Sequence, residues 1–200
     1  MAKGEQTRRE IVNQAYVLAG TKGLEGVTLG TLADRMGLSK SGLFAHFKSK
    51  ESLQLEVLQS AIDRFVAQVV LPALTKARGL PRLRSLFELY LDWIAGAPGK
   101  GSCFFMTLTQ EYDDRPGPLR DLLVQSQREW QKTIARVART AIEEGHFARQ
   151  IDADQVAYEV VGIGMIFQQS HKLLEDSRAR LRARRAFDAL LTRCRLQPAA

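Results

Sequence analysis

The sequence of 200 residues predicts an all-α fold of about nine helices. Apolar residues recur at helical spacing through most of the chain, and Ser, Thr or Asp stands at several of the helix starts. Gly and Pro cluster at the breaks between these segments. The period-2 alternation with hairpin turns that is typical of strands is absent. With 45% hydrophobic residues, the chain is long enough to bury a core without disulfides or metals.

The chain begins with a predicted amphipathic helix. Residues 7–10 (Thr-Arg-Arg-Glu) resemble a capping box, in which the first and last side chains satisfy free backbone N–H groups. The apolar residues that follow form one stripe that reaches Gly23: Ile11, Ala15, Leu18 and Ala19.

Residues 27–47 predict two short helices joined by a tight turn. Thr28 can cap the first helix, and Gly37 offers the left-handed backbone geometry that ends it. Ser39 can cap the second. The small Ala33 lets the two helices approach at the steep angle of a helix-turn-helix, whose second helix can enter a DNA major groove.

Six further helices are predicted after this motif. They cover about residues 50–71, 81–95, 102–112, 119–144, 152 or 154 to 175, and 179–196. We therefore expect a DNA-binding head over residues 1–52 and a larger helical domain over residues 53–200. Residues 53–71 would connect the two.

The net charge of +7 is concentrated near the helix-turn-helix. Residues 1–50 hold eight Lys and Arg against four Asp and Glu, whereas the other 150 residues hold 21 against 18. This distribution favours phosphate binding by the head, although a soluble protein can also be basic without a nucleic-acid partner.

Two lysines oppose the dipole of the helix on which they lie. Lys40 and Lys50 stand in first turns, where a cation is unfavourable unless an anion such as a DNA phosphate compensates. The alternative is that both are solvated. Phe44 can contact a thymine methyl group or a sugar, or can be buried against the first helix of the motif. The predicted DNA contacts are Thr28, Ser39, Lys40, Ser41, Gly42, Phe44, His46, Lys48 and Lys50.

This part of the chain resembles the TetR family of transcriptional regulators. The matching residues are Ile11, Ala15, Gly23, Val27, Thr28, Leu32, Ala33, Gly37, Leu38, Ser39, Gly42, Leu43, Phe44, His46, Phe47, Lys50, Glu51, Ser52 and Leu53. The resemblance implies a homodimer that binds a palindromic operator in duplex DNA and responds to a small-molecule effector. It also implies that the long helix from Lys50 acts as a lever. The family usually has Tyr at the position of Phe44, where its hydroxyl commonly reaches a phosphate.

The C-terminal part contains many large apolar side chains that either fill a core or line an effector pocket. The predicted pocket residues are Tyr90, Trp93, Phe104, Phe105, Glu111, Trp130, Met165 and Gln168. The last two predicted helices resemble the dimerisation pair of the family, which would form a four-helix bundle with a twofold mate. The predicted interface residues are Tyr158, Val161, Gly162, Met165, Phe187, Leu190 and Leu191.

Three other patterns leave alternatives open. Gly162 and Gly164 do not complete a dinucleotide fingerprint, and they allow close helix packing within a subunit or across a dimer seam. The arginines of residues 178–185 can bind nucleic acid, face solvent, or pair with carboxylates of a partner subunit. Cys103 is a buried thiol or a redox sensor.

Catalysis is not expected. Three His and two Cys form no nucleophile–base pair and no metal-ligand spacing, so no catalytic residue, metal or cofactor is predicted. No apolar run reaches 18 residues and no signal segment begins the chain, which favours a cytoplasmic protein without a membrane span. A DNA-binding adaptor or activator that needs no small molecule is the alternative function.

Overall fold

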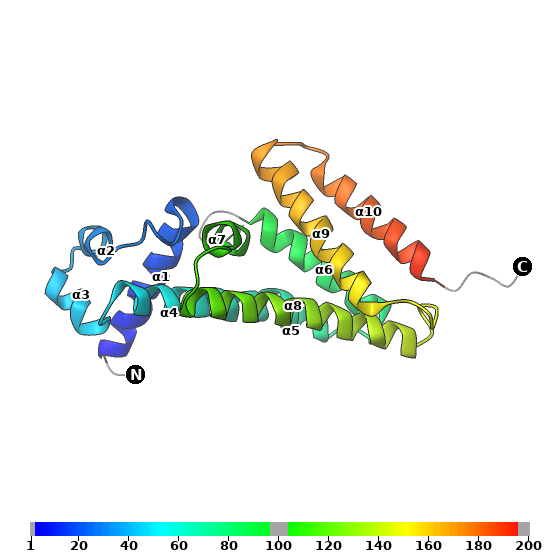
Figure 1. Ribbon diagram of the computed structural model, residues 1–200, viewed down its shortest axis with the longest axis horizontal. Coiled ribbons are helices and arrows are strands. Elements are labelled where there is room, and N and C mark those ends of the chain that lie inside the picture. Colours follow the sequence, from blue (N-terminus) through cyan, green and yellow to red (C-terminus); the bar gives the residue numbers. More distant parts are fainter. Residues whose placement is uncertain (1–2, 97–103, 196–200) are drawn as a thin grey trace, which may run out of the picture. The chain divides into compact units, whose positions relative to one another are not determined.

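The computed structural model describes residues 3–96 and 104–195, and within these ranges the regular elements are all helical (Figure 1). The all-α prediction is confirmed. The elements are α1 (Lys3–Lys22), α2 (Leu29–Met36), α3 (Lys40–His46), α4 (Lys50–Phe65), η1 (Val66–Val70), α5 (Leu71–Leu74), α6 (Leu80–Ala95), α7 (Phe104–Tyr112), α8 (Pro118–Glu143), α9 (Ala153–Gln168), η2 (Gln169–Leu173) and α10 (Ala179–Cys194). Cys103 lies outside the described residues.

The predicted helix over residues 50–71 is longer than expected. α4, η1 and α5 form one continuous stretch, Lys50–Leu74, in which η1 is a π-helical segment and Pro72 stands in the first turn of α5. A proline has no N–H to donate, so it suits a place where the regular α-helical hydrogen bonding is interrupted, and Pro72 lies two residues after the π-helical segment η1. By length and composition this stretch can cross a membrane, but Leu53, Val57 and Leu58 on it are fully buried in a protein core.

The described residues form two compact units. Unit 1 contains α1 to α4, α7 and the first residues of α8, whereas unit 2 contains η1, α5, α6, the rest of α8, α9, η2 and α10. Unit 1 thus contains the predicted DNA-binding head together with residues 53–65 and α7.

Unit 1 has one apolar core shared by α1 to α4, α7 and α8. The ring of Tyr16 on α1 lies 5.3 Å from the ring of Phe104 on α7, measured between centroids. Leu108 of α7 and Leu119 of α8 belong to the same buried cluster. The head therefore buries its apolar side chains partly against residues that follow it by about 50 to 100 positions in the chain.

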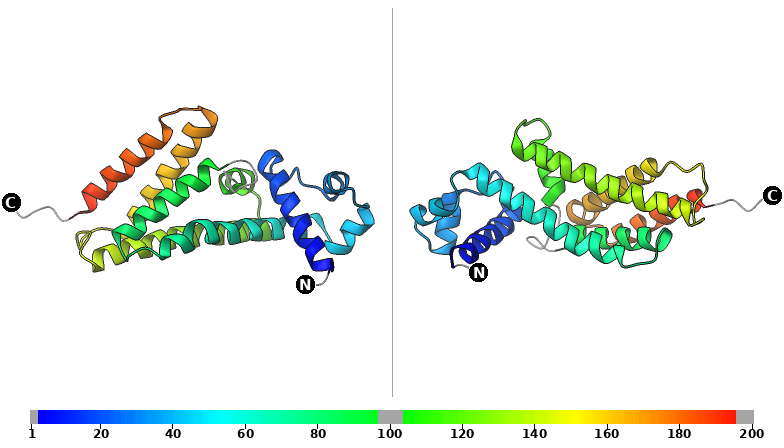
Figure 2. Two further views of the ribbon diagram at one scale, coloured as in Figure 1. Left: turned by 180° about the vertical axis from the view of Figure 1, so that it is seen from behind. Right: turned by 90° about the horizontal axis from the view of Figure 1, so that it is seen from below.

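Unit 2 is built on the contact of α9 with α10 and α6, and Figure 2 shows α9 and α10 side by side. Phe87 of α6 stacks on Phe187 of α10 with centroids 3.9 Å apart. Gly164 of α9 lies against Tyr90 of α6, since a Cβ atom at Gly164 would be 2.2 Å from the ring. Gly164 thus packs within the protomer, whereas Gly162 meets open space.

Candidate nucleic-acid interface

The helix-turn-helix has the capping geometry that the sequence predicts. The Thr28 hydroxyl accepts a hydrogen bond from the N–H of Thr31, and the Thr31 hydroxyl accepts one from the N–H of Thr28, both at 3.1 Å. Gly37 ends α2 at φ +64°, and its N–H donates to the Ala33 carbonyl. A side chain at Gly37 would meet no atom within 4 Å, so glycine is needed there for the left-handed backbone and not for space.

α3 separates a buried face from an exposed one. Ser39 caps the helix by accepting a hydrogen bond from the Gly42 N–H at 3.1 Å. Leu43 and Phe47 are fully buried, whereas Phe44 is 55% exposed. The alternative in which Phe44 is buried against α2 is therefore wrong. Ser41 and Gly42 are also exposed, so the outer face of α3 is open to a ligand.

The remaining predicted contacts lie at the ends of these helices. Thr28 and Lys48 are exposed and His46 is half-buried; Lys40 begins α3, and its side chain is not described. Lys50 differs from expectation. Its ammonium group lies 2.7 Å from the Glu25 carboxylate and donates to the Glu25 carbonyl at 2.9 Å. The electrostatic conflict at the start of α4 is thus relieved inside the protein, without a phosphate.

The turn between α1 and α2 is held by side chains from α4 and α7. The Glu111 carboxylate accepts hydrogen bonds from the N–H groups of Leu24 (3.2 Å) and Glu25 (2.9 Å). The Tyr112 hydroxyl donates to the other oxygen of the Glu25 carboxylate at 2.7 Å. From α4, buried Gln54 donates to the Leu24 carbonyl at 3.0 Å. We call Glu25, Lys50, Glu111 and Tyr112 the turn network.

Electrostatics within the turn network favour the charged form of Glu25. The hydrogen bond from Lys50, followed by that from Tyr112, lowers the pKa of the Glu25 carboxyl. Burial, with the nearby Glu25 charge, raises the pKa of Tyr112. Glu111, expected in an effector pocket, instead uses both oxygens to hold this turn. Glu25 and Tyr112 were not predicted, because the partners lie 87 residues apart and no local pattern marks them.

The predicted pocket residues belong to both units. Tyr90, Trp93 and Trp130 are buried in unit 2, where the rings of Tyr90 and Trp130 lie 5.2 Å apart between centroids. Phe104, Phe105 and Glu111 belong to unit 1. In unit 2, Gln168 is half-buried and Met165 is 57% exposed.

The predicted dimer residues divide into an exposed and a buried set. Tyr158, Gly162 and Met165 are exposed on α9, and Val161 is half-buried. Phe187, Leu190 and Leu191 of α10 are buried inside unit 2, which corrects their assignment to an intersubunit surface. They are apolar at helical spacing because they pack within the protomer.

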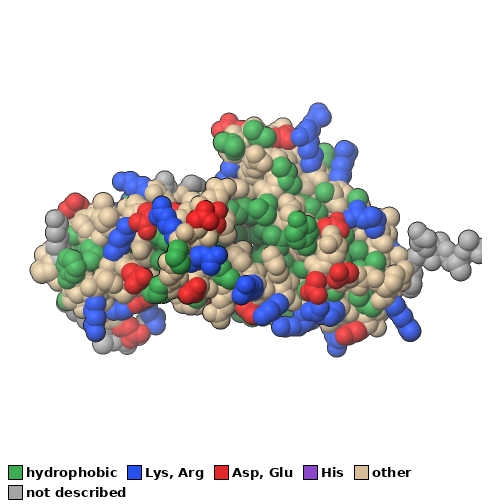
Figure 3. All heavy atoms as spheres, viewed as in Figure 1, with side chains coloured by type: hydrophobic (Ala, Val, Ile, Leu, Met, Phe, Trp, Pro, Cys, Tyr) green, Lys and Arg blue, Asp and Glu red, His purple; other side chains and the backbone are tan. Residues whose placement is uncertain are grey.

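The arginines of α10 pair within unit 2. Arg180 contacts Asp92 at 2.8 Å and Arg184 contacts Glu88 at 2.8 Å. Arg182 is paired in the same way with Asp176. On the face that Figure 3 shows, blue basic and red acidic side chains are interspersed. Arg193 also pairs with Glu159. These contacts do not favour a nucleic-acid site on α10, because carboxylates already neutralise four of its arginines.

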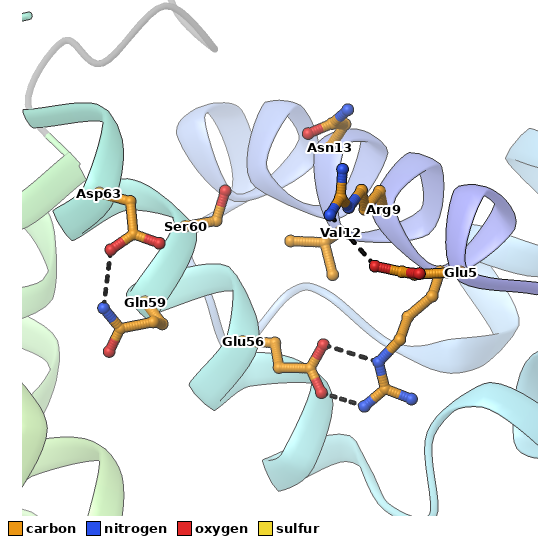
Figure 4. Close-up of a pocket in the computed structure, with 9 residues that line it drawn as sticks. Glu5, Arg9, Val12, Asn13, Glu56, Gln59, Ser60 and Asp63 are labelled. Carbon is orange, nitrogen blue, oxygen red and sulfur yellow. Dashed lines mark hydrogen bonds and ion pairs between the residues drawn. The ribbon is translucent and has the colours of Figure 1, made fainter. Parts of the chain in front are cut away.

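An open groove of about 560 Å³ lies between α1 and α4 (Figure 4). Its walls carry both charges: Glu5, Arg8, Arg9, Glu56 and Asp63. Arg9 pairs with Glu5 along α1 at 3.1 Å, whereas Arg8 reaches across to Glu56 on α4. In the described residues no group of His, Cys, Asp and Glu has metal-binding geometry.

Two family models match the chain. "Bacterial regulatory proteins, tetR family" covers residues 11–57, and "Tetracyclin repressor-like, C-terminal domain" covers residues 79–187. The transcriptional activator FasR of Mycolicibacterium smegmatis is 26% identical over 156 residues, which is 78% of this chain and 70% of FasR. The transcriptional repressor KstR2 of Mycobacterium tuberculosis is 26% identical over 151 residues, 74% of this chain and 73% of KstR2.

A solved structure agrees with these matches. A putative transcriptional regulator from Saccharomonospora viridis, crystallised with choline, has a TM-score of 0.77 and 26% identity, with 96% of this chain and 100% of that one covered. The second family model alone matches more than half of the chain, and the first contains the whole helix-turn-helix. The chain therefore belongs to the TetR family of DNA-binding transcriptional regulators, which are not enzymes.

Proposed function

We propose that this regulator is a cytoplasmic homodimer that represses transcription from a palindromic operator and is released by a small-molecule effector. The observation that carries the proposal is the exposed outer face of α3, on which Ser41, Gly42 and Phe44 are accessible while Leu43 and Phe47 anchor the helix from behind. A short helix anchored in this way can enter a major groove.

The proposed DNA contacts divide by role. Lys40, Ser41, Gly42 and Phe44 on α3 would meet base edges or sugars. The helix ends and nearby cations would meet phosphates: Thr28, Ser39, His46, Lys48 and Lys50. The Lys50 ammonium group is already paired with Glu25, but it has three N–H donors. Lys50 would therefore contact a phosphate with a remaining donor while it stays paired with Glu25.

The proposed dimer face lies on α9. Tyr158, Met165 and Ile166 are 71%, 57% and 55% exposed, and Gly162 lies between them at helical spacing. Large apolar side chains that stay exposed on one helix face are typical of subunit interfaces.

A charge introduced at this face should separate the subunits. The variant Met165→Arg should therefore sediment as a monomer at micromolar concentration. Leu74→Arg, at an exposed apolar residue outside this face, is the matched control.

The turn network supports the effector-dependent part of the proposal. Glu111 and Tyr112 end α7 and bond the turn that precedes α2. A ligand that displaces α7 would therefore displace the helix-turn-helix. The choline complex of the Saccharomonospora viridis regulator supports a small molecule as the effector, and choline is the first compound to test.

Selection of bound sequences from random duplex DNA tests the proposal. We expect an inverted repeat whose half-sites lie about one helical turn apart, roughly 10 base pairs. Selected sites without twofold symmetry would overturn the palindromic operator. The effector is then sought by release of labelled operator, with choline as the first addition. If no cellular small-molecule extract changes operator affinity, the protein is a ligand-independent adaptor or activator instead.

Lys50 provides a second test of the interface. Lys50→Met should lower the slope of log affinity against log salt by about one, because one phosphate contact is lost. Lys132→Met is the control, since Lys132 pairs with Glu129 in unit 2. An unchanged slope in Lys50→Met would show that Lys50 serves the turn network alone.

A further inference from the structure

The side chain of Arg8 joins three helices of unit 1, α1, α3 and α4. It leaves α1 and bonds the Glu56 carboxylate of α4 with two nitrogens, Nη2 and Nε, the latter at 3.0 Å. Its third nitrogen, Nη1, donates to the backbone carbonyl of His46, the last residue of α3. The guanidinium group also lies over the Phe47 ring, with Cζ 4.6 Å from the centroid. Figure 4 shows the two bonds that reach Glu56.

The position of α3 depends on such contacts. The helix has seven residues, which is too short to be stable in isolation, so tertiary contacts must hold it. Leu43 and Phe47 fix the buried side of the helix. The His46 carbonyl is one of the last four carbonyls of α3, which have no partner within the helix, and a cation is favourable at this end of the helix dipole.

We propose that Arg8 is a positioning residue for DNA recognition. By tying the C-terminal end of α3 to α1 and α4, it sets the orientation in which Ser41, Gly42 and Phe44 meet the bases. It does so without touching DNA. This inference rests on DNA binding by α3, and it assigns to a residue outside the helix-turn-helix a share in sequence preference.

The contacts of Arg8 give it a structural role that needs no phosphate. Each of its three guanidinium nitrogens donates one hydrogen bond within unit 1, and the group lies over the Phe47 ring. The side chain is 41% exposed and Nη1 and Nη2 each keep a second N–H, so the salt slope is the measurement that separates positioning from phosphate contact. The hydrogen bonds to Glu56 raise the pKa of Arg8, which keeps the group charged. Arg9, one residue further along α1, is exposed and pairs only with Glu5 among the described residues.

Arg9 supplies the matched control, because both variants remove one positive charge from the same turn of α1. Arg8→Met, Arg8→Lys and Arg9→Met are compared on a duplex that the wild-type protein selects from random DNA, and on a scrambled duplex of equal length. Affinity is measured by fluorescence anisotropy over a series of salt concentrations. Amide hydrogen exchange of α3 and thermal unfolding by circular dichroism are recorded for each protein.

Arg8→Met should bind the selected duplex about 10- to 100-fold more weakly, the range that charged hydrogen bonds of this kind support. The scrambled duplex should lose much less affinity, and the salt slope should stay at the wild-type value. Exchange of the α3 amides should rise. Arg8→Lys keeps the charge but lacks the forked guanidinium group that spans Glu56 and His46. Its affinity for the selected duplex should therefore lie between those of the wild type and Arg8→Met. Arg9→Met should remain close to wild type on both duplexes.

Two results would overturn the inference. If Arg8→Met and Arg9→Met lose equal affinity for the selected duplex, the effect of Arg8 is one of net charge alone. If the slope of log affinity against log salt falls by about one in Arg8→Met, Arg8 contacts a phosphate directly. If Arg8→Met does not fold, Arg8→Lys decides: wild-type affinity for the selected duplex would refute positioning. Failure of the wild-type protein to select any duplex would instead count against the proposed operator, which separates the two proposals.

Discussion

Two glycines of α9, two residues apart, should respond in opposite ways to the same substitution. Gly162→Ala places a methyl group in open space, whereas Gly164→Ala places one 2.2 Å from Cε1 and 2.8 Å from the hydroxyl oxygen of Tyr90. The Tyr90 ring has little room to move, because it is 6% exposed and lies beside Trp130.

The difference between the two variants isolates the cost of overpacking. In both, alanine gains about 0.8–1 kcal/mol over glycine from helix propensity. At Gly164 the clash should cost about 1–3 kcal/mol. Gly162→Ala should therefore stabilise the protein by up to about 1 kcal/mol, and Gly164→Ala should be less stable than Gly162→Ala by about 1–3 kcal/mol.

Urea unfolding, followed by circular dichroism, measures these free energies of unfolding. Each kcal/mol also shifts Tm by about 2–4 °C in a chain of this size. Because Gly162 lies on the proposed dimer face, each variant is measured at two protein concentrations to separate association from helix stability. Equal stability of the two variants would refute the close packing of α9 on Tyr90.

Three further substitutions test the head. Phe44→Tyr should bind DNA up to about tenfold more tightly, because a hydroxyl on this exposed ring gains one hydrogen bond to a phosphate; anisotropy with unchanged or weaker affinity would contradict this. Tyr16→Phe should raise the free energy of unfolding by about 1 kcal/mol, because the buried Tyr16 hydroxyl has no hydrogen-bond partner in the described residues. Burial also raises the pKa of this hydroxyl to about 12. A lower free energy of unfolding for Tyr16→Phe in urea would show that the hydroxyl does have a partner. Glu25→Gln should destabilise the protein at neutral pH and much less in acid: the pKa of Glu25 is lowered by Lys50 and Tyr112, so its contribution is present above the ordinary glutamate pKa and disappears as pH falls through the lowered value. A pH-independent difference in urea unfolding between Glu25→Gln and wild type would refute the charged role of Glu25.

The elements of the head could be predicted because their signals are local. Thr28 and Ser39 bond N–H groups three residues ahead, and Gly37 adopts a backbone that other residues avoid. Each signal lies within one helical turn of the bond that it makes. The exposure of Phe44 could not be predicted in this way, since helical spacing alone does not distinguish its two alternatives.

Long-range contacts account for most of what the sequence did not predict. From the sequence alone, Glu111 can equally be a polar group in a pocket or a hydrogen-bond acceptor for a distant turn. Phe187 has the spacing of a buried residue, but the spacing does not say whether the same subunit or its mate buries it. Arg8 and Arg9 are neighbours of the same chemistry, and only the fold shows that one reaches α4 while the other stays on α1.

The shared core of unit 1 has a consequence for how this regulator can be divided. A fragment that ends at residue 52 would lose Phe104 and Leu108 from its interior and would present the ring of Tyr16 to water. It would also lose the carboxylate that receives two amides of the turn before α2. A fusion of this DNA-binding head to another sensor domain would therefore have to include α7.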